Sequence, residues 1–392
     1  MAAATLPSYR HGAVVFVGCC PECAAREGKP MSAPRLKVLM STGPLKHHDN
    51  PYLQQLVTDL SDQVDVQPLS WRTALFFRPD VFHVHWPEQL YRANGRAKTM
   101  VKRVLVAILL LRLRARRVPV VLTVHDLAPH DKDRGFERLL SRALERMFAL
   151  RIYLNESEQN DPARGVVILH GDYRGWLQKQ GVDLAPREPQ RDVILFGLLR
   201  RYKGIETLIT AARDADATLT IAGRTIDEPY ERELRALVAD VPSAVLDIRH
   251  LEDDELTAEI FNHRIVCLPY THMHNSGALV YALSVGRPVL ARRSPFNEVI
   301  AREVGEEWVI LYDGPLTAKI LEDALNRNPP TGLPDLSRWD WSTGIALHMA
   351  CYRGLAAMAH DGRPPEMVVQ ALLEAEPGFA AHSAFNAPVE IS

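Results

Sequence analysis

The chain has 392 residues, of which 47% are hydrophobic and 24% are charged, with 5 cysteines and a formal net charge of -2. This length and composition suit two or three globular domains, which excludes a fibrous repeat, a disordered chain and a disulfide scaffold. The longest apolar run, Val104 to Leu111, is much shorter than the ~20 residues of a membrane-spanning helix. We therefore expect no transmembrane segment.

Residues 1–34 contain three clustered cysteines, Cys19, Cys20 and Cys23. Three thiols and the distant His11 are a poor match to a tetrahedral zinc site, and the short apolar run before Cys19 resembles only a weak lipoprotein signal. We predict a disordered leader that ends where the first strand begins. Reduced thiols in a cytosolic protein are the simplest interpretation of the cysteine content.

From Arg35 to Ala185, apolar runs of strand length alternate with segments of helical periodicity. This alternation is typical of a parallel sheet covered by helices on both faces, so we predict a Rossmann-like, doubly wound domain over residues 35–185. Its predicted strands are Leu36–Met40, Val64–Val66, Val81–Val84, Val118–Val124, Arg151–Leu154 and Val166–Leu169.

A linker with two prolines, residues 181–191, precedes a second series of the same kind. We predict a second Rossmann-like domain over residues 186–340, followed by a closing helix and a loose tail over residues 341–392. Two such α/β domains would face each other across a cleft at the carboxyl ends of their strands. The second set of predicted strands is Val193–Phe196, Thr218–Ala222, Ala244–Ile248, Ile265–Leu268, Pro288–Ala291 and Trp308–Leu311.

Charge is distributed unevenly along the chain. Residues 35–185 carry 23 basic and 16 acidic residues, whereas residues 186–392 carry 20 and 30. The segment Lys98–Arg117 combines an apolar centre with basic ends, which suits either a helix in a membrane interface or a core helix with solvated ends. The residues that would face an anionic membrane surface are Lys102, Arg103, Arg112, Arg114, Arg116 and Arg117.

Two loops of the second domain suit a diphosphate. The first follows Val193–Phe196 and presents cationic side chains, which stabilise the charge that develops on a leaving nucleoside diphosphate. The second follows Ile265–Leu268 and leads into an apolar helix, whose first amides favour an anion. The predicted diphosphate-binding residues are Arg200, Lys203, Asn275, Ser276 and Gly277.

The order of these motifs resembles the glycosyltransferases of the GT-B fold. A closer resemblance, to the family of xanthan-type β-1,4-mannosyltransferases, extends from Arg35 to about Arg353. The segments that carry it are Asn50-Pro-Tyr-Leu, His83-Val-His-Trp-Pro-Glu88, His125-Asp-Leu-Ala-Pro-His130, Leu169-His-Gly-Asp-Tyr-Arg174, Arg201-Tyr-Lys-Gly204 and Met273-His-Asn-Ser-Gly277.

The resemblance implies mannosyl transfer from GDP-mannose to a polyprenyl-diphosphate-linked oligosaccharide in exopolysaccharide biosynthesis. It also implies a peripheral enzyme on the inner, cytoplasmic face of the plasma membrane, with no cofactor, no metal ion and no nucleic-acid partner. Many retaining GT-B enzymes have two glutamates where this chain has Met273 and Tyr281, so an inverting reaction is favoured. Met273 and His274 would then contact the donor sugar.

Inverting transfer needs a base that accepts the proton of the acceptor hydroxyl. The first candidate is Glu88, the second Asp126 and the third Asp172, although Glu88 and Asp126 could instead cap a helix or anchor a loop. His125 could contact the donor sugar or order its loop.

Three alternatives to mannosyl transfer remain open. The donor could be a UDP-sugar, because no residue of the sequence distinguishes guanine from uracil. The protein could also be a nucleotide-sugar 2-epimerase of the same fold, or a non-catalytic scaffold that has lost the base.

Overall fold

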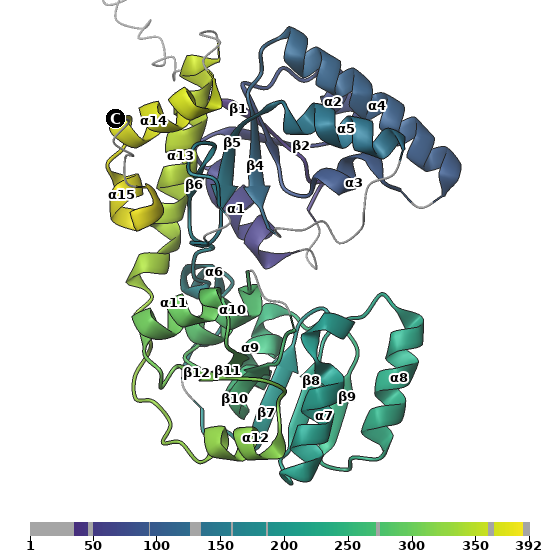
Figure 1. Cartoon of the computed structure of the whole chain (residues 1–392), viewed down its shortest axis with the longest axis vertical. Coiled ribbons are helices and arrows are strands. Elements are labelled where there is room, and N and C mark those ends of the chain that lie inside the picture. The colour runs from purple at the N-terminus through teal and green to yellow at the C-terminus, as the bar shows by residue number, and fades with distance from the viewer. Residues whose placement is uncertain are drawn as a thin grey trace, which may run out of the picture. The chain divides into compact units, whose positions relative to one another are not determined.

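Two parallel sheets of six strands organise the chain in the computed structural model (Figure 1). The structure describes residues 35–45, 50–93, 95–125, 135–157, 160–185, 187–271, 275–359 and 364–386. The predicted leader, Asp126, Met273 and His274 lie outside these ranges. Both sheets belong to one compact unit, Leu36–Ser392.

The first sheet has the strand order β2-β1-β3-β4-β5-β6, so its order reverses between β1 and β3. Every pairing is parallel, as the predicted alternation of strands and helices requires. The strands are β1 (Lys37–Met40), β2 (Asp65–Pro68), β3 (Val81–Val84), β4 (Val120–Val124), β5 (Phe148–Tyr153) and β6 (Gly165–Val167).

The second sheet has the order β12-β11-β10-β7-β8-β9, which is the strand order of the Rossmann fold, and it reverses between β7 and β10. All twelve predicted strands are present in the two sheets, with ends shifted by a few residues. The second set is β7 (Arg191–Phe196), β8 (Leu219–Ala222), β9 (Ala244–Asp247), β10 (His263–Leu268), β11 (Val289–Arg292) and β12 (Val309–Tyr312).

Helices bury both faces of the first sheet. Asn50 begins α1 by accepting a hydrogen bond from the Tyr52 amide at 2.9 Å, and Pro51 occupies the first turn, where its missing N–H costs no hydrogen bond. One face packs against α1 (Pro51–Ser61), α13 (Trp341–Met358) and α14 (Pro365–Ala375). The other packs against α2 (Trp71–Phe76), α3 (Pro87–Tyr91), α4 (Arg96–Ala115) and α5 (Phe136–Glu145).

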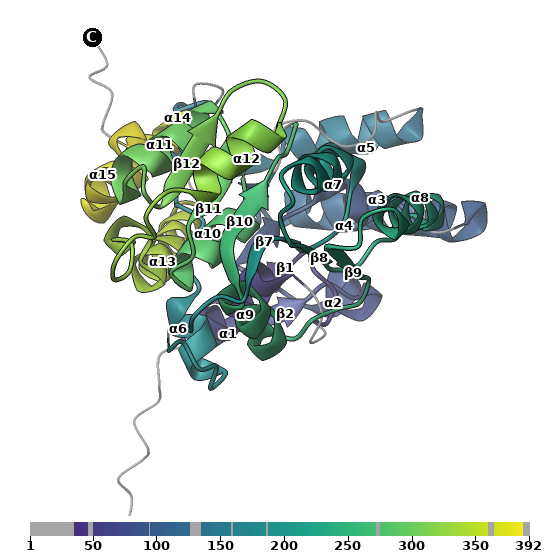
Figure 2. The same ribbon diagram turned by 90° about the horizontal axis from the view of Figure 1, so that it is seen from below.

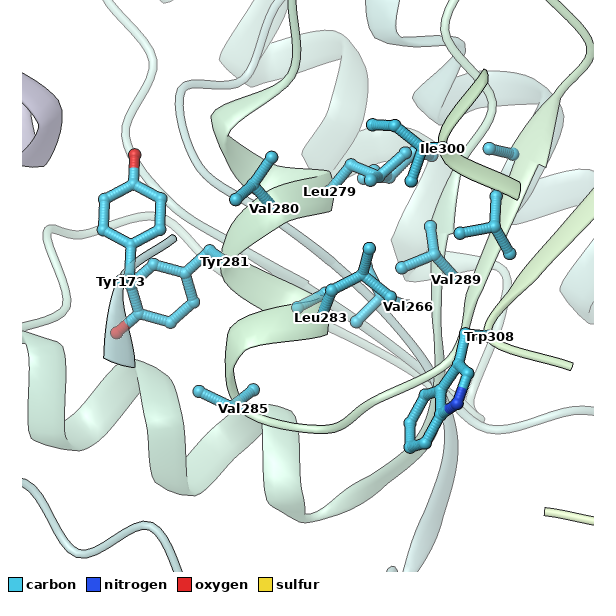
Figure 3. Packing of buried hydrophobic residues seen from close by; sticks show 14 of the residues in the cluster. Tyr173, Val266, Leu279, Val280, Tyr281, Leu283, Val285, Val289, Ile300 and Trp308 are labelled. Atoms are coloured by element: carbon cyan, nitrogen blue, oxygen red, sulfur yellow. The ribbon is translucent and has the colours of Figure 1, made fainter. Parts of the chain in front are cut away.

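Helices cover the second sheet in the same way, and Figure 3 shows the apolar packing around α10. One face packs against α6 (Arg174–Lys179), α9 (Asp253–Phe261), α10 (Gly277–Ser284) and α11 (Pro295–Val304). The other packs against α7 (Ile205–Asp214), α8 (Glu228–Ala239) and α12 (Ala318–Leu325).

The chain exchanges one helix in each direction between the two sheets. Helix α6 follows the first sheet in sequence but buries Trp176 and Leu177 in the core of the second, whereas α13 follows the second sheet and packs on the first (Figures 1 and 2). The two crossing segments touch, because the Asp172 amide donates to the Trp339 carbonyl at 2.8 Å. Gly171 has a φ of +79°, and a Cβ there would lie 2.3 Å from the Trp341 ring.

The region predicted to be a loose tail is largely helical within the described residues. It contains α14, α15 (Gly378–His382) and a short turn at Ala384–Asn386, and it buries Val368, Leu372 and Phe379 in the core of the first sheet. The Asn386 side chain accepts from the Val167 amide at 2.7 Å and donates to the Val167 carbonyl at 2.8 Å. The prediction was wrong because the alanines and prolines obscured an apolar spacing that suits a helix.

Phe379 tests whether this region belongs to the core. Phe379 is fully buried, so Phe379→Ala should lower the free energy of unfolding by about 3–5 kcal/mol, measured by urea denaturation. Met367→Ala, at a side chain that is 55% exposed, is the matched control and should change it by less than about 0.5 kcal/mol. Equal, small effects of both substitutions would show that the region contributes little to the fold.

Candidate active site

A cavity of about 470 Å³ lies at the carboxyl ends of strands from both sheets. Asn50, Trp86 and His125 reach it from the loops after β1, β3 and β4, which include the reversal point of the first sheet. Residues that follow β7 and β10, on either side of the reversal point of the second sheet, form the opposite wall. Ligands of α/β folds bind at such reversal points, so this cavity is the candidate active site.

Lys203 is a buried cation in the wall of this cavity. Its Nζ atom lies 3.4 Å from the Phe196 carbonyl oxygen and 4.9 Å from the centre of the Tyr270 ring, and the residue is only 6% exposed. Burial, together with the charge of Arg200, lowers the pKa of Lys203 to about 7. An anionic ligand would favour the protonated form and so restore the charge.

The first turn of α10 forms the neighbouring wall. Gly277 and Ala278 line the cavity, and a Cβ on Gly277 would lie 3.2 Å from the Tyr173 hydroxyl oxygen, so a small residue suits this position. Ser276 lies just before the helix and accepts a hydrogen bond from the Leu279 amide at 3.1 Å. The amides of this turn can therefore meet an anion, while the Ser276 hydroxyl holds the end of the helix.

The Asn275 side chain connects loops that follow different sheets. Its Nδ2 donates to the His125 carbonyl at 2.8 Å, and its Oδ1 accepts from Asn155 Nδ2 at 2.7 Å. Asn275 thus lines the cavity with its side chain already bound to protein groups. Arg200 does not line the cavity, although its charge acts on Lys203.

His125 lies in the cavity wall as a neutral side chain. It stacks on Trp86 with ring centres 4.1 Å apart, and burial lowers its pKa to about 3. Its Nε2 lies 3.0 Å from His85 Nδ1, while His85 Nε2 lies 3.1 Å from the sulfur of Met40.

The Met40 sulfur determines which nitrogens of these histidines carry hydrogen. Because a thioether only accepts hydrogen bonds, His85 must carry its hydrogen on Nε2 to bind the sulfur, which leaves Nδ1 to accept from His125 Nε2. His125 then keeps Nδ1 as an acceptor for a hydroxyl group. With a pKa of about 3, His125 is uncharged at neutral pH and can orient a ligand through a hydrogen bond.

The structure does not bring two of the predicted bases, Glu88 and Asp172, together with Lys203, and Asp126 lies outside the described residues. Trp86 occupies the position in the cavity wall after β3, whereas Glu88 already lies in α3 and lines a separate cavity with Ser41 and Lys102. Asp172 is buried at the crossing of the chain, accepts from the Arg174 amide at 2.7 Å and is not in the cavity wall.

Sequence reasoning missed the end of the cavity that follows β8 and β9. The signal was available, because each of these residues follows the carboxyl end of a strand or begins the next helix. The missed residues are Arg224, Arg249, His250, Leu251 and Asp253.

The six basic residues predicted to face a membrane divide into two groups. Lys102 donates to the carbonyls of Gln89 and Arg92, Arg103 pairs with Glu137, and Arg112 donates to the carbonyls of Ala74 and Phe77. For these three residues the structure shows contacts that stabilise the fold. Arg114, Arg116 and Arg117 are exposed.

Neither a spanning helix nor a metal site was found in the part of the chain that the structure describes. None of its helices is both long and apolar enough to cross a bilayer. Within the same ranges, no three His, Cys, Asp or Glu side chains are grouped to hold a metal ion. His83 of β3 is packed between the hydroxyls of Tyr352 and Thr123 at 2.6 and 2.7 Å.

Comparison with solved structures defines the class of fold. HepE from Anabaena in complex with UDP-glucose matches with 15% identity and a TM-score of 0.51 over 87% of this chain and 99% of that chain. Sucrose-phosphate synthase from Thermosynechococcus elongatus matches with 14% identity and a TM-score of 0.55 over 82% and 100%. The chain therefore has the GT-B fold of glycosyltransferases, as predicted.

Sequence comparison then defines the family. GDP-mannose:glycolipid 4-β-D-mannosyltransferase from Xanthomonas campestris pv. campestris is 40% identical over 343 residues, which cover 84% of this chain and 95% of the relative. No family model matches the chain. The chain belongs to the family of GDP-mannose:glycolipid 4-β-D-mannosyltransferases and is a glycosyltransferase.

The lowered pKa of Lys203 predicts a pH dependence of stability. Between pH 7 and 10.5 the unfolded state binds more protons at this lysine than the folded state, so stability should rise with pH in that window. Urea denaturation of the wild type should show a gain of about 2–3 kcal/mol from pH 7 to pH 9 that is absent in Lys203→Met. Identical pH profiles for the two proteins would contradict a buried lysine with a pKa of about 7.

Proposed function

We propose that the protein transfers mannose from GDP-mannose to a polyprenyl-diphosphate-linked oligosaccharide, with inversion at the anomeric carbon, in exopolysaccharide biosynthesis. The observation that carries the proposal is the position of Lys203, a buried cation in the cavity at the reversal points of both sheets. The name of the relative that is 40% identical supports the choice of donor and of a glycolipid acceptor.

In the proposed reaction the diphosphate leaves towards the second sheet. The Lys203 ammonium group and the first amides of α10 would stabilise the negative charge that grows on the leaving oxygen, and no cofactor is needed for this. Because the cavity desolvates Lys203 before a ligand arrives, the diphosphate and the lysine each compensate the buried charge of the other.

The sugar and the acceptor would occupy the wall formed by the first sheet. Neutral His125, with Nδ1 as an acceptor, would orient a hydroxyl group of the sugar, and Trp86 would hold the imidazole ring in place. Since Glu88 lies in a separate cavity, the proposal assigns the base to Asp126, which follows the cavity residue His125 in sequence. Met273 and His274 remain the proposed contacts of the donor sugar.

Donor preference tests this proposal directly. Calorimetric titration should show tighter binding of GDP than of UDP or ADP, and Lys203→Ala should weaken GDP binding by about 10-fold or more. With GDP-mannose, membrane extracts should yield a mannosylated lipid only in the presence of the unaltered enzyme. Tighter binding of UDP would indicate a UDP-sugar donor in place of GDP-mannose. Conversion of a nucleotide sugar without an acceptor would indicate an epimerase. Absence of nucleotide binding would indicate a scaffold.

Helices α4 and α5 carry a surface that suits the proposed membrane location. They pack beside each other (Figure 1). Helix α4 buries one face in the core, and its side chains Val104, Ile108 and Leu111 are exposed. Leu139 of α5 is 60% exposed. The buried face of α4 suits the role of a core helix, and its exposed apolar face suits a helix in a membrane interface. The exposed cations Arg114, Arg116 and Arg117 lie at the end of this helix. We place this surface on the inner face of the plasma membrane.

Vesicle flotation tests the membrane surface. With phosphatidylglycerol-containing vesicles, Ile108→Glu/Leu111→Glu should reduce binding by about 10-fold or more, because two exposed apolar side chains no longer enter the lipid. Ile226→Glu, at a side chain of the second sheet region that is 72% exposed, is the control and should bind as the wild type does. Equal flotation of both variants would contradict the proposal that α4 binds a membrane surface.

A further inference from the structure

The candidate active site contains one feature that anion binding does not explain, the carboxylate of Asp253. Asp253 begins α9 and lines the cavity together with Leu251 and Leu256. A carboxylate repels a diphosphate, but it can accept hydrogen bonds from another part of the same ligand.

Helices α6 and α10 both contact Asp253. From α6, Trp176 Nε1 donates to Asp253 Oδ2 at 2.8 Å. From α10, the Tyr281 hydroxyl donates to the Asp253 carbonyl at 3.3 Å and lies 3.1 Å from Thr257 Oγ1. Figure 3 shows Tyr281 beside Tyr173, and their ring centres are 5.2 Å apart. The carboxylate is therefore held in place before a ligand binds.

The cavity wall between Lys203 and Asp253 suits a nucleoside. Gly223 follows β8 with a φ of +143°, and a Cβ there would lie 2.0 Å from the Gly197 carbonyl oxygen. No side chain can therefore cover the backbone at this position. Leu251 and Leu256 add apolar surface next to Asp253, on which a flat aromatic base can pack. A ligand with its diphosphate at Lys203 would direct its base towards this surface.

We infer that Asp253 selects guanine by accepting hydrogen bonds from the N1–H and the 2-amino group. Guanine presents these two donors side by side on one edge, which matches a carboxylate. Uracil presents a single N–H between two carbonyl oxygens, which a carboxylate repels, and adenine presents its amino group beside an acceptor nitrogen. The inference rests on the proposed function, because it assigns a residue to the choice of GDP over UDP.

A carboxylate could also bind the hydroxyls of the ribose, as in dinucleotide-binding folds. The two roles differ in what they distinguish. A ribose contact would serve every nucleotide equally and would respond to removal of the 2′-hydroxyl. A guanine contact would respond to removal of the 2-amino group, which is the sole difference between GDP and inosine diphosphate.

The test is calorimetric titration of the full chain with GDP, inosine diphosphate, 2′-deoxy-GDP and UDP. The wild type should bind GDP about 10-fold or more tightly than inosine diphosphate. Asp253→Asn should weaken GDP binding by about 10-fold or more, reduce the preference over inosine diphosphate to about 2-fold, and leave UDP binding no weaker. The matched control is Asp254→Asn, at the exposed neighbour on the same helix, which should match the wild type.

Two outcomes would overturn this inference alone. One is GDP preference in the wild type without discrimination against inosine diphosphate, a comparison that does not depend on the folding of any variant. The other is an equal loss of GDP, inosine diphosphate and UDP binding in Asp253→Asn with sensitivity to the 2′-hydroxyl, which would assign Asp253 to the ribose. Tighter binding of UDP than GDP by the wild type would instead overturn the proposed donor and this inference together.

Discussion

The contact between the two chain crossings is the constraint on which the site depends. The Asp172 amide binds the Trp339 carbonyl where α6 and α13 exchange places between the sheets, and Gly171 leaves room for the Trp341 ring. Arg338, next to this contact, pairs with Glu156 before β6 and with Glu303 of α11. Since each sheet receives a helix from the other, the strand ends that form the cavity are covalently and sterically coupled.

Burial removes charge from several side chains of the cavity before a ligand binds. Burial lowers the pKa values of His125 and His170 to about 3 and 4, and that of Lys203 to about 7. A neutral side chain avoids the free-energy cost of burying an isolated charge in the empty cavity. Ligand binding and protonation of Lys203 are therefore linked, and the enzyme is expected to take up a proton when a diphosphate enters.

The sequence allowed a correct prediction of the fold because each strand is a continuous apolar run next to a helical segment. Three residues that were predicted for the site because they follow strand ends, Lys203, Gly277 and His125, line the cavity, and their roles stay predictions. The role of His125 depends on His85 and Met40, which no local pattern connects. Glu88 also follows a predicted strand, but it does not line this cavity. Trp86 lies in the cavity wall after β3, and α3 begins at Pro87, so Glu88 is already part of that helix.

Contacts over long sequence separations explain the other differences. Asn275 looked like a ligand for phosphate, but its amide joins His125 to Asn155, a partner 120 residues away. Basic residues of α4 looked like one membrane surface, but the structure uses Lys102, Arg103 and Arg112 to anchor neighbouring segments. Charge patterns indicate exposure only where the surrounding fold supplies no partner.

Helix α15 and the turn after it cover the edge of the first sheet at β6. Asn386 pairs with both backbone groups of Val167, and His382 Nε2 accepts from the Leu169 amide at 3.0 Å. These contacts lie two residues apart, which is the spacing at which a neighbouring strand would bind. Side chains from the last described segment thus occupy the hydrogen-bonding edge of β6, so this edge is closed to pairing with a strand of another molecule, a route by which open sheets aggregate.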